Sequence, residues 1–394
     1  MTIAIKEEDY EKMDEDELNE KLIEGIINSS LFEVRNSLKN GADANYMTDS
    51  SHYEGFFEEP ALSLSNSSKI TQLLIDYGAD VNAKDTNGLS SLMKTRFTEI
   101  GGILIENGAD VNAKDNDGLT ALMKTENIEI AEILIKNGAD VNAKSSGLDP
   151  TIMISQSIDV IKLLIKSGAD VNATDSEGGT VLMQNQSADT VKYLVENGAN
   201  VNQKNNKGDS AYFFSKSIHA RIALIESGFD VNTKSSGGFS AIMVSQDPKF
   251  TEFLIKNGAD VNSTNATDTS VLMRNLSMYL YCDEEEEENR RDNVELLVQN
   301  GANVNYQRKT DGKTPLMLVE CVSDAHFLIT AGADLSIKDK DGKTAVNQDQ
   351  LNFPRLIELR RYIENQSLLH SLKAVDQEMT KQKPVFKPRK RERL

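Results

Sequence analysis

The hydrophobic pattern of this chain alternates between two kinds of apolar segment. The longer kind, seen at Ile130–Lys136 and Val160–Lys166, places its apolar residues at helical spacing on one broad face. The shorter kind comes about ten residues earlier and starts with a hydroxyl residue, as in Thr120–Met123. A hydroxyl side chain there can accept a hydrogen bond from the first unpaired N–H groups of a helix. The pattern therefore predicts a short helix followed by a longer amphipathic helix.

The short segment recurs through most of the chain and usually ends in methionine. A flexible apolar methionine can fill the space between neighbouring helices. Phe213 takes the methionine position once. The segments are Ser90–Met93, Thr120–Met123, Thr151–Met153, Thr180–Met183, Ser240–Met243, Ser270–Met273 and Thr314–Met317.

Glycine marks the end of each long segment, where it can take the left-handed conformation that closes a helix. The residues that follow end in pairs such as Asn87-Gly88 and Asp117-Gly118, which favour a hairpin-like turn. From Gly78 to Gly258 the glycines are spaced 30 residues apart, and such a strict period is typical of a stacked solenoid. The glycines that open these turns are Gly41, Gly78, Gly108, Gly138, Gly168, Gly198, Gly228, Gly258, Gly301 and Gly332.

This organisation, with Thr314-Pro-Leu-Met317 and Gly258-Ala-Asp-Val-Asn262, resembles that of ankyrin repeats across roughly residues 20–365. The resemblance implies an all-α solenoid of about eleven helix-turn-helix units joined by hairpin-like turns. Ankyrin units usually have 33 residues, and the three missing here lie between the two helices. We therefore expect a short helix of little more than one turn. Methionine also replaces the family's histidine, so the stack lacks that polar tie and is expected to be looser or differently curved.

Charge and composition divide the chain into three parts. The net charge is −19, but Lys381–Leu394 carries seven Lys or Arg and one Glu, so the rest is near −25. We expect an acidic N-terminal segment at residues 1–20, a repeat array at 21–365, and a C-terminal helix with a basic disordered tail at 366–394. An acidic body disfavours nucleic acid, except at the tail, and favours a basic protein partner.

Two insertions interrupt the period, near residues 50–59 and 278–292. The first brings Tyr53, Phe56 and Phe57 together, and it can either cover the end of the stack or form a partner-binding finger. The second contains Glu284–Glu288, which we expect to form a solvated acidic loop. Docking of a basic partner there is an alternative, whereas the ligand spacing of a calcium site is absent.

Two features near the C-terminus also have alternatives. The basic tail resembles a nuclear import signal, and it could instead contact nucleic acid, anionic lipid, the acidic body, or nothing specific. Phe353–Ile363 superficially resembles the F-box-like segment of some viral ankyrin proteins. It lies where the long helix of a last repeat is due, so we expect it to cap the array.

The chain lacks the residue patterns of an enzyme. Its histidines, His52, His219, His326 and His370, are scattered without partner motifs, and Cys282 and Cys321 have no metal-site or disulfide spacing. No phosphate-binding loop or nucleophile elbow occurs. We expect no catalytic residues, no metal and no cofactor. No apolar run is long enough to cross a membrane, and cysteine usage suggests a cytoplasmic protein.

In ankyrin proteins the turn tips and the start of the short helix line a concave groove that contacts partners. By position, the resemblance implies partner contacts at Lys84, Asn87, Leu89, Lys114, Asp117, Leu119, Asp149, Asp209 and Phe239. We expect Leu89, Leu119 and Phe239 to be exposed. Lysines recur at the same point of the period, at Lys84, Lys114, Lys144, Lys204 and Lys234.

The turn asparagines Asn112 and Asn142 lie in contexts that resemble hydroxylated asparagines of animal ankyrin proteins, but we expect them to stabilise the turns. The predicted function is a protein-binding scaffold or adaptor, and the alternative is an acidic inhibitor or immunity protein that blocks a basic enzyme. A microbial or viral origin fits the Lys-, Asn- and Ile-rich composition. A secreted effector or viral protein would act in a host cytoplasm or nucleus.

Overall fold

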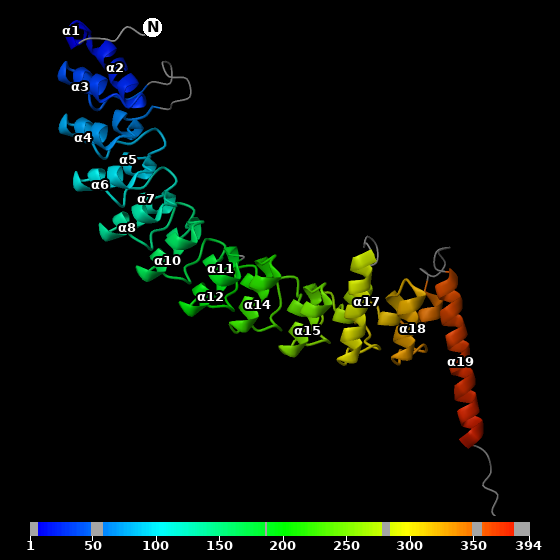
Figure 1. The fold of residues 1–394 in the computed structure, drawn as a ribbon. Coiled ribbons are helices and arrows are strands. Elements are labelled where there is room, and N and C mark those ends of the chain that lie inside the picture. Colours follow the sequence, from blue (N-terminus) through cyan, green and yellow to red (C-terminus); the bar gives the residue numbers. More distant parts are fainter. Residues whose placement is uncertain (1–6, 49–57, 186, 278–283, 349–356, 382–394) are drawn as a thin grey trace, which may run out of the picture. The chain divides into compact units, whose positions relative to one another are not determined.

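The computed structural model describes residues 7–48, 58–185, 187–277, 284–348 and 357–381. Their contacts divide the chain into two compact units, Met1–Ser227 and Gly228–Leu394. The described part of each unit is a stack of helices joined by turns, with isolated β-bridges in place of strands (Figure 1). This confirms the predicted all-α solenoid. No helix in the described ranges is long and apolar enough to cross a membrane.

In the N-terminal unit, short and long helices alternate as predicted. The short helices α5, α7, α9, α11 and α13 have four residues each, which confirms the expected single turn. The long helices from α4 to α14 have nine residues each. The helices are α1 (Glu7–Tyr10), α2 (Glu15–Ile27), α3 (Leu31–Lys39), the 3-10 helix η1 (Ala61–Leu64), α4 (Ser68–Asp76), α5 (Ser91–Lys94), α6 (Thr98–Glu106), α7 (Ala121–Lys124), α8 (Ile128–Lys136), α9 (Thr151–Ile154), α10 (Ile158–Lys166), α11 (Val181–Gln184), α12 (Ala188–Glu196), α13 (Ala211–Phe214) and α14 (Ile218–Glu226).

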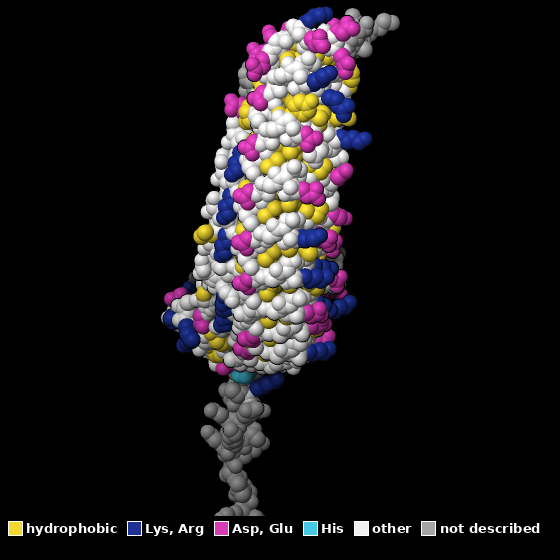
Figure 2. All heavy atoms as spheres, turned by 90° about the vertical axis from the view of Figure 1, so that its left-hand side faces the viewer, with side chains coloured by type: hydrophobic (Ala, Val, Ile, Leu, Met, Phe, Trp, Pro, Cys, Tyr) yellow, Lys and Arg dark blue, Asp and Glu magenta, His cyan; other side chains and the backbone are white. Residues whose placement is uncertain are grey.

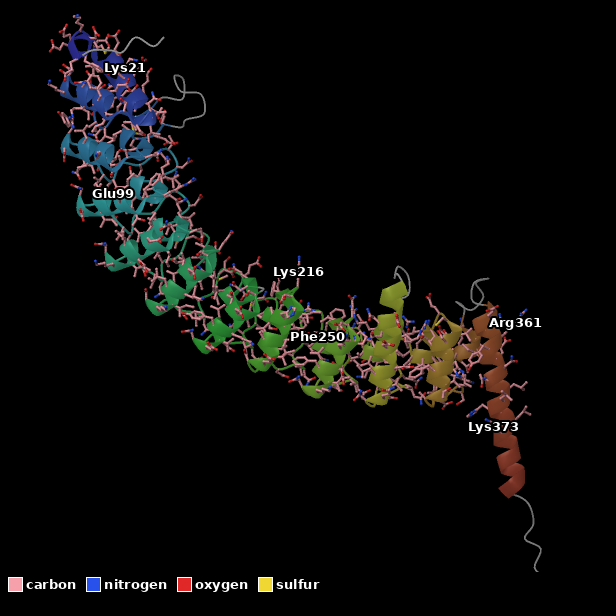
Figure 3. All side chains as sticks on the ribbon, viewed as in Figure 1. Lys21, Glu99, Lys216, Phe250, Arg361 and Lys373 are labelled. Atoms are coloured by element: carbon pink, nitrogen blue, oxygen red, sulfur yellow. The ribbon has the colours of Figure 1, made fainter. Side chains whose placement is uncertain are left out.

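The C-terminal unit continues the alternation with two longer helices. Its helices are η2 (Ala241–Val244), α15 (Pro248–Lys256), α16 (Val271–Leu276), α17 (Glu284–Gln299), η4 (Pro315–Leu318), α18 (Val322–Thr330), η5 (Ala345–Asn347) and α19 (Ile357–Lys381). Phe250 of α15 is buried in this stack, while Arg361 and Lys373 project from α19 (Figure 3).

The first repeat begins before the predicted array boundary. Helix α2 starts at Glu15, where the Asp14 side chain accepts from the Glu17 N–H and Glu17 bonds back to Asp14. It packs against α3, and its buried Asn19 accepts a hydrogen bond from the Asp43 N–H at 2.8 Å. Residue 20, the end of the expected acidic segment, therefore lies inside a helix of the stack.

The short helices are held by burial more than by their caps. Met123, Met183 and Met273 are all buried, as expected for residues that fill the space between repeats. The predicted hydroxyl cap forms at Thr120 and Ser270, whose side chains accept from the N–H groups three residues later. The other positions differ. The buried hydroxyls of Ser90, Ser210 and Ser240 have no hydrogen-bond partner, and Thr151 is the first residue of α9 and donates to the Ala143 carbonyl.

The prediction for the acidic insertion was wrong. Glu284–Glu288 do not form a loop, because α17 begins at Glu284 and extends the long helix of this repeat to 16 residues. Farther along α17, Arg290 forms a buried ion pair with Asp324 of α18 at 2.9 Å. The aromatic insertion with Tyr53, Phe56 and Phe57 lies outside the described residues. Its base is closed by Thr48 and Glu59, which pair through the Thr48 N–H and the Glu59 carbonyl at 2.9 Å.

The C-terminal helix α19 packs against α18 and η5 through its first turns, where Ile363 is buried. The Tyr362 hydroxyl lies 2.6 Å from the His326 ring nitrogen of α18. These contacts are those of a capping helix, in agreement with the expected role of Phe353–Ile363. Residues 353–356 themselves lie outside the described ranges.

In most of the described turns an asparagine joins its repeat to the next one. The Asn142 side chain donates to the Gly168 carbonyl at 3.1 Å and accepts from the Asp170 N–H at 2.8 Å. Asn112 makes the same two bonds to Gly138 and Asp140. These asparagines therefore stabilise the stack between repeats, and not only their own turn. The same pair of bonds forms at Asn45, Asn82, Asn172, Asn232, Asn262 and Asn305.

We expect Asn142→Ala to lower the free energy of unfolding by about 1–3 kcal/mol, because it removes two hydrogen bonds of about 1 kcal/mol each. It should also broaden the urea transition, since the stability of a solenoid depends on the interfaces between neighbouring repeats. The measurement is urea unfolding followed by circular dichroism. Asn137→Ala is the matched control, because Asn137 is also exposed but its side chain bonds within its own repeat, to the Ile133 carbonyl. Equal effects of the two substitutions would rule out a special role for the inter-repeat bonds.

Candidate partner-binding surface

The connecting turns of the N-terminal unit form a row of small hairpins, which we call the turn face. It comprises residues 84–90, 114–120, 144–150, 174–180 and 204–210. Isolated antiparallel bridges close four of these hairpins, pairing Lys84 with Ser90, Lys144 with Pro150, Thr174 with Thr180 and Lys204 with Ser210. The predicted hairpin-like turn is therefore confirmed.

One side chain fixes the shape of each hairpin tip. Asp85 accepts from the N–H groups of Asn87 and Leu89 at 2.9 and 2.8 Å. Asp115 does the same for Asp117 and Leu119 at 3.0 and 2.8 Å. The tips are thus rigid, whereas the residues that they present differ from repeat to repeat.

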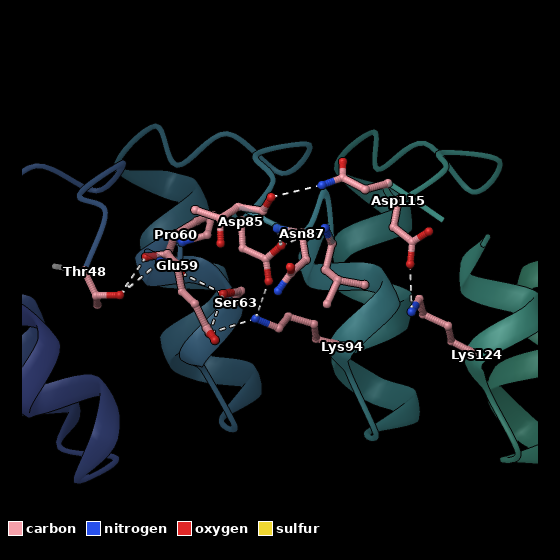
Figure 4. Close-up of polar contacts among 12 residues, drawn as sticks. Thr48, Glu59, Pro60, Ser63, Asp85, Asn87, Lys94, Asp115 and Lys124 are labelled. Atoms are coloured by element: carbon pink, nitrogen blue, oxygen red, sulfur yellow. Dashed lines mark hydrogen bonds and ion pairs between the residues drawn. The ribbon is translucent and has the colours of Figure 1, made fainter. Parts of the chain in front are cut away.

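Ion pairs tie these acidic groups to the short helices (Figure 4). Lys94 of α5 contacts Asp85 at 3.0 Å and Glu59 at 2.8 Å. Lys124 of α7 contacts Asp115 at 2.7 Å. Burial favours the protonated form of Asp115, but the hydrogen bonds from Lys124 and from the tip N–H groups, together with the Lys124 charge, lower its pKa below the ordinary 3.8.

Neighbouring tips are joined through their backbones. The Asn116 N–H donates to the Asn87 carbonyl at 3.0 Å, and the Ser146 N–H donates to the Asp117 carbonyl at 2.8 Å. This contact requires glycine directly after the residue whose carbonyl accepts the bond. A Cβ added to Gly118, whose φ is +75°, would lie 2.5 Å from the Ser146 nitrogen.

The predicted lysine stripe forms a second ladder along the turn face. The Lys84 ammonium donates to the Lys114 carbonyl, and the Lys114 ammonium donates to the Lys144 carbonyl, both at 2.8 Å. Lys144 continues to the Thr174 carbonyl at 2.9 Å. These side chains are exposed, yet their charged ends lie against the next repeat. Lys84 and Lys114 therefore join neighbouring repeats. The partner contact predicted for them stays a prediction.

The predicted apolar contacts are less exposed than expected. Leu89 and Leu119 hold equivalent positions in successive hairpins and are half-buried. Phe239 is also half-buried and belongs to the C-terminal unit, where the Arg274 guanidinium lies 4.7 Å from its ring centre. All three groups were expected to be exposed, and the structure places each of them in the half-buried range instead.

The other predicted contacts lie on the same hairpins. Asn87 and Asp117 are exposed at the tips, and Asp149 and Asp209 are half-buried at the position of Leu89. The structure thus places eight of the predicted contacts in one row, on the N-terminal unit: Lys84, Asn87, Leu89, Lys114, Asp117, Leu119, Asp149 and Asp209.

Sequence reasoning missed Leu148. Its side chain is 55% exposed, and its φ of +69° is the left-handed conformation taken by Gly88, Gly118 and Gly178 in the other hairpins. A residue with a side chain pays about 1–2 kcal/mol for that conformation. The sequence does contain this signal, because the equivalent position of the neighbouring hairpins is glycine.

The long-helix side of the stack has a different surface. In Figure 2, columns of acidic and basic side chains run beside narrow apolar bands on this side. Among the described residues, no group of three or more His, Cys, Asp or Glu could hold a metal ion.

Comparison with known proteins identifies the repeat. The family model described as ankyrin repeats (3 copies) matches residues 61–145 and 152–265, about half of the chain. Among curated proteins the comparison finds no match. In total, 447 chains of solved structures match, and one is the ankyrin repeat domain of Bcl-3, described as a unique member of the IkappaB protein family. It is 23% identical, with a TM-score of 0.44, over 52% of this chain and 97% of that domain.

The Asp115 ion pair predicts a specific pH dependence. A folded pKa below 3.8 means that Asp115 stabilises the fold above that pH and loses this contribution as the pH falls through the lowered value. Asp115→Asn removes the charge that pairs with Lys124. Near pH 7 it should lower the free energy of unfolding by less than about 1 kcal/mol, the range of a single ion pair of this kind. Asn205 shows that an asparagine can keep the two tip hydrogen bonds, with distances of 3.0 and 2.9 Å.

Urea unfolding of wild type and Asp115→Asn from about pH 7 to about pH 2 tests this prediction, and the two curves should converge in acid. The control is Asp117→Asn, an exposed neighbour for which we expect little change at any pH. A difference between wild type and Asp115→Asn that persists in strong acid would contradict the assignment.

Proposed function

The chain belongs to the ankyrin repeat family, and we propose that it is a protein-binding scaffold or adaptor that engages its partner through the turn face. Ankyrin repeats generally mediate protein–protein interactions. The observation that carries the proposal is the combination of a rigid hairpin frame with tip residues that change from repeat to repeat. Rigid scaffolds that display variable loops are typical of binding surfaces.

The frame is built from groups that recur with the period. Asp85 and Asp115 hold the tip N–H groups, and backbone bonds such as Asp117 to Ser146 join the tips. A partner therefore meets a surface whose conformation is already set, which reduces the entropy lost on binding. This supports recognition by many small contacts along the row.

The residues displayed at the tips change along the row. The residue before the turn glycine position is Asn87, Asp117, Gly147, Glu177 and Lys207 in successive hairpins. Two positions later the series is Leu89, Leu119, Asp149, Gly179 and Asp209. Such variation within a constant frame supports selection for one partner's surface, with apolar contacts toward α5 and α7 and polar contacts toward α9 and α13.

We expect the double substitution Leu89→Asp with Leu119→Asp to weaken partner binding at least about tenfold, which corresponds to about 1.4 kcal/mol. Aspartate replaces apolar contact area with charge at the interface. It should not unfold the hairpins, because Asp149 and Asp209 already occupy the same position. The measurement is isothermal titration with a partner captured from the source cell and purified.

Phe97→Asp is the control, because Phe97 is 49% exposed but lies in the connection between α5 and α6, away from the hairpin tips. Its binding should equal that of wild type. A partner that binds the Leu89→Asp, Leu119→Asp variant as tightly as wild type would exclude the turn face as its site.

A further inference from the structure

Leu148 adopts a backbone conformation that the other tips of the turn face leave to glycine. Its φ is +69°, compared with +77° at Gly88 and +76° at Gly178. In the C-terminal unit Asp268 also has a positive φ, of +60°, but its carboxylate accepts from the Tyr306 hydroxyl at 2.7 Å. The side chain of Leu148 can make no such bond. No side-chain hydrogen bond therefore offsets the strain of its conformation.

The Leu148 side chain also coincides with a break in the row of tip contacts. Backbone bonds join Asp117 to Ser146 and Glu177 to Asn206, both at 2.8 Å. Between Gly147 and Ser176, both well inside the described ranges, the corresponding bond is not formed. The clash that a Cβ would make at Gly118 explains the break, because a side chain at this place pushes the next tip away.

Leu148 is, moreover, the most exposed large hydrophobic residue in the described part of the N-terminal unit, at 55%. Strain and a lost hydrogen bond disfavour the folded state, and the exposed apolar side chain contributes little to its stability. All three coincide at one tip in the middle of the turn face. Exposed apolar groups on rigid supports are typical anchors of protein interfaces.

The surroundings of Leu148 are mainly acidic. Asp117 lies on the preceding tip, Asp149 follows Leu148, and Glu177 lies on the next tip. Glu177 contacts Lys207 at 3.0 Å, but both side chains are 68% exposed, so water and salt screen that pair. The nearby Lys144 ammonium is turned to the Thr174 carbonyl. A binding surface opposite this tip would need positive charge around an apolar centre.

We propose that Leu148 is an anchor residue that inserts into an apolar pocket of a protein partner, and that Lys or Arg side chains of the partner rim this pocket. The inference rests on the proposed function of the turn face. It adds the location of the anchor and the chemistry of the surface that receives it.

Leu148→Gly separates binding from folding, because the two should change in opposite directions. Glycine relieves the strained φ and allows the Gly147 to Ser176 bond to form, so urea unfolding should need the same or a higher urea concentration than wild type. Partner affinity should fall at least about tenfold. Leu148→Asn, which tolerates the left-handed conformation, should lose affinity as well. Phe97→Ser should leave affinity unchanged.

The partner is found with a photoreactive residue at position 148 of the full-length chain, expressed in the source cell, with the same residue at position 97 as control. The protein crosslinked only from position 148 is identified by mass spectrometry and purified. We expect the crosslink to fall on apolar residues flanked by Lys or Arg. We also expect binding to weaken as salt rises, and to weaken less steeply for Asp117→Asn with Asp149→Asn.

Three outcomes would overturn the anchor assignment. They are the absence of a crosslink specific to position 148, a crosslinked surface without basic residues, and unchanged affinity of Leu148→Gly. If the partner still loses affinity for the Leu89→Asp, Leu119→Asp variant, the proposed function stands and only the anchor is wrong. If neither variant affects any captured protein, both proposals fail.

Discussion

The register of the stack depends on one interaction, the pair of hydrogen bonds that a turn asparagine makes with the next repeat. Helices of four and nine residues are too short to persist alone in water, so each repeat needs its neighbours. Burial of residues such as Met123 and Leu134 supplies most of that dependence, but burial has little direction. Asn112 and Asn142 add direction, because each binds one carbonyl and one N–H at fixed places. They therefore fix the register in which the turns stack.

Because the register is fixed, the turn face can vary without losing its shape. Asp85 and Asp115 hold each tip, and the lysine ladder runs between repeats without using the tip side chains. Leu148 shows that one hairpin tip can differ from the others without disrupting the stack. One tip there gives up its backbone bond and takes a strained conformation, while Asn142 and Asn172 on either side keep the repeats in place. Because the asparagine bonds hold the repeats together, a strained tip with a missing backbone bond is compatible with a stable stack.

Much of this could be predicted from the sequence, because the information repeats. With a period of 30 residues, the patterns of the hairpin, the short helix and the long helix occur many times. One ambiguous repeat therefore does not change the prediction of the fold. The prediction of an acidic loop at Glu284–Glu288 failed where the period failed. A helix formed there because glutamate is a good helix former and the N-terminal end of a helix favours negative charge.

The sequence by itself determined the fold, the boundaries of most repeats and the row of residues on the turn face, since these follow from periodicity and local conformation. Tertiary structure decided what each residue does in that row. Only the stack shows that Lys84 reaches the next repeat, that Leu119 is half-buried, and that a side chain at position 148 breaks a backbone bond. These facts depend on distances between residues about 30 positions apart. Local sequence carries no direct record of such distances, because they arise only when neighbouring repeats pack.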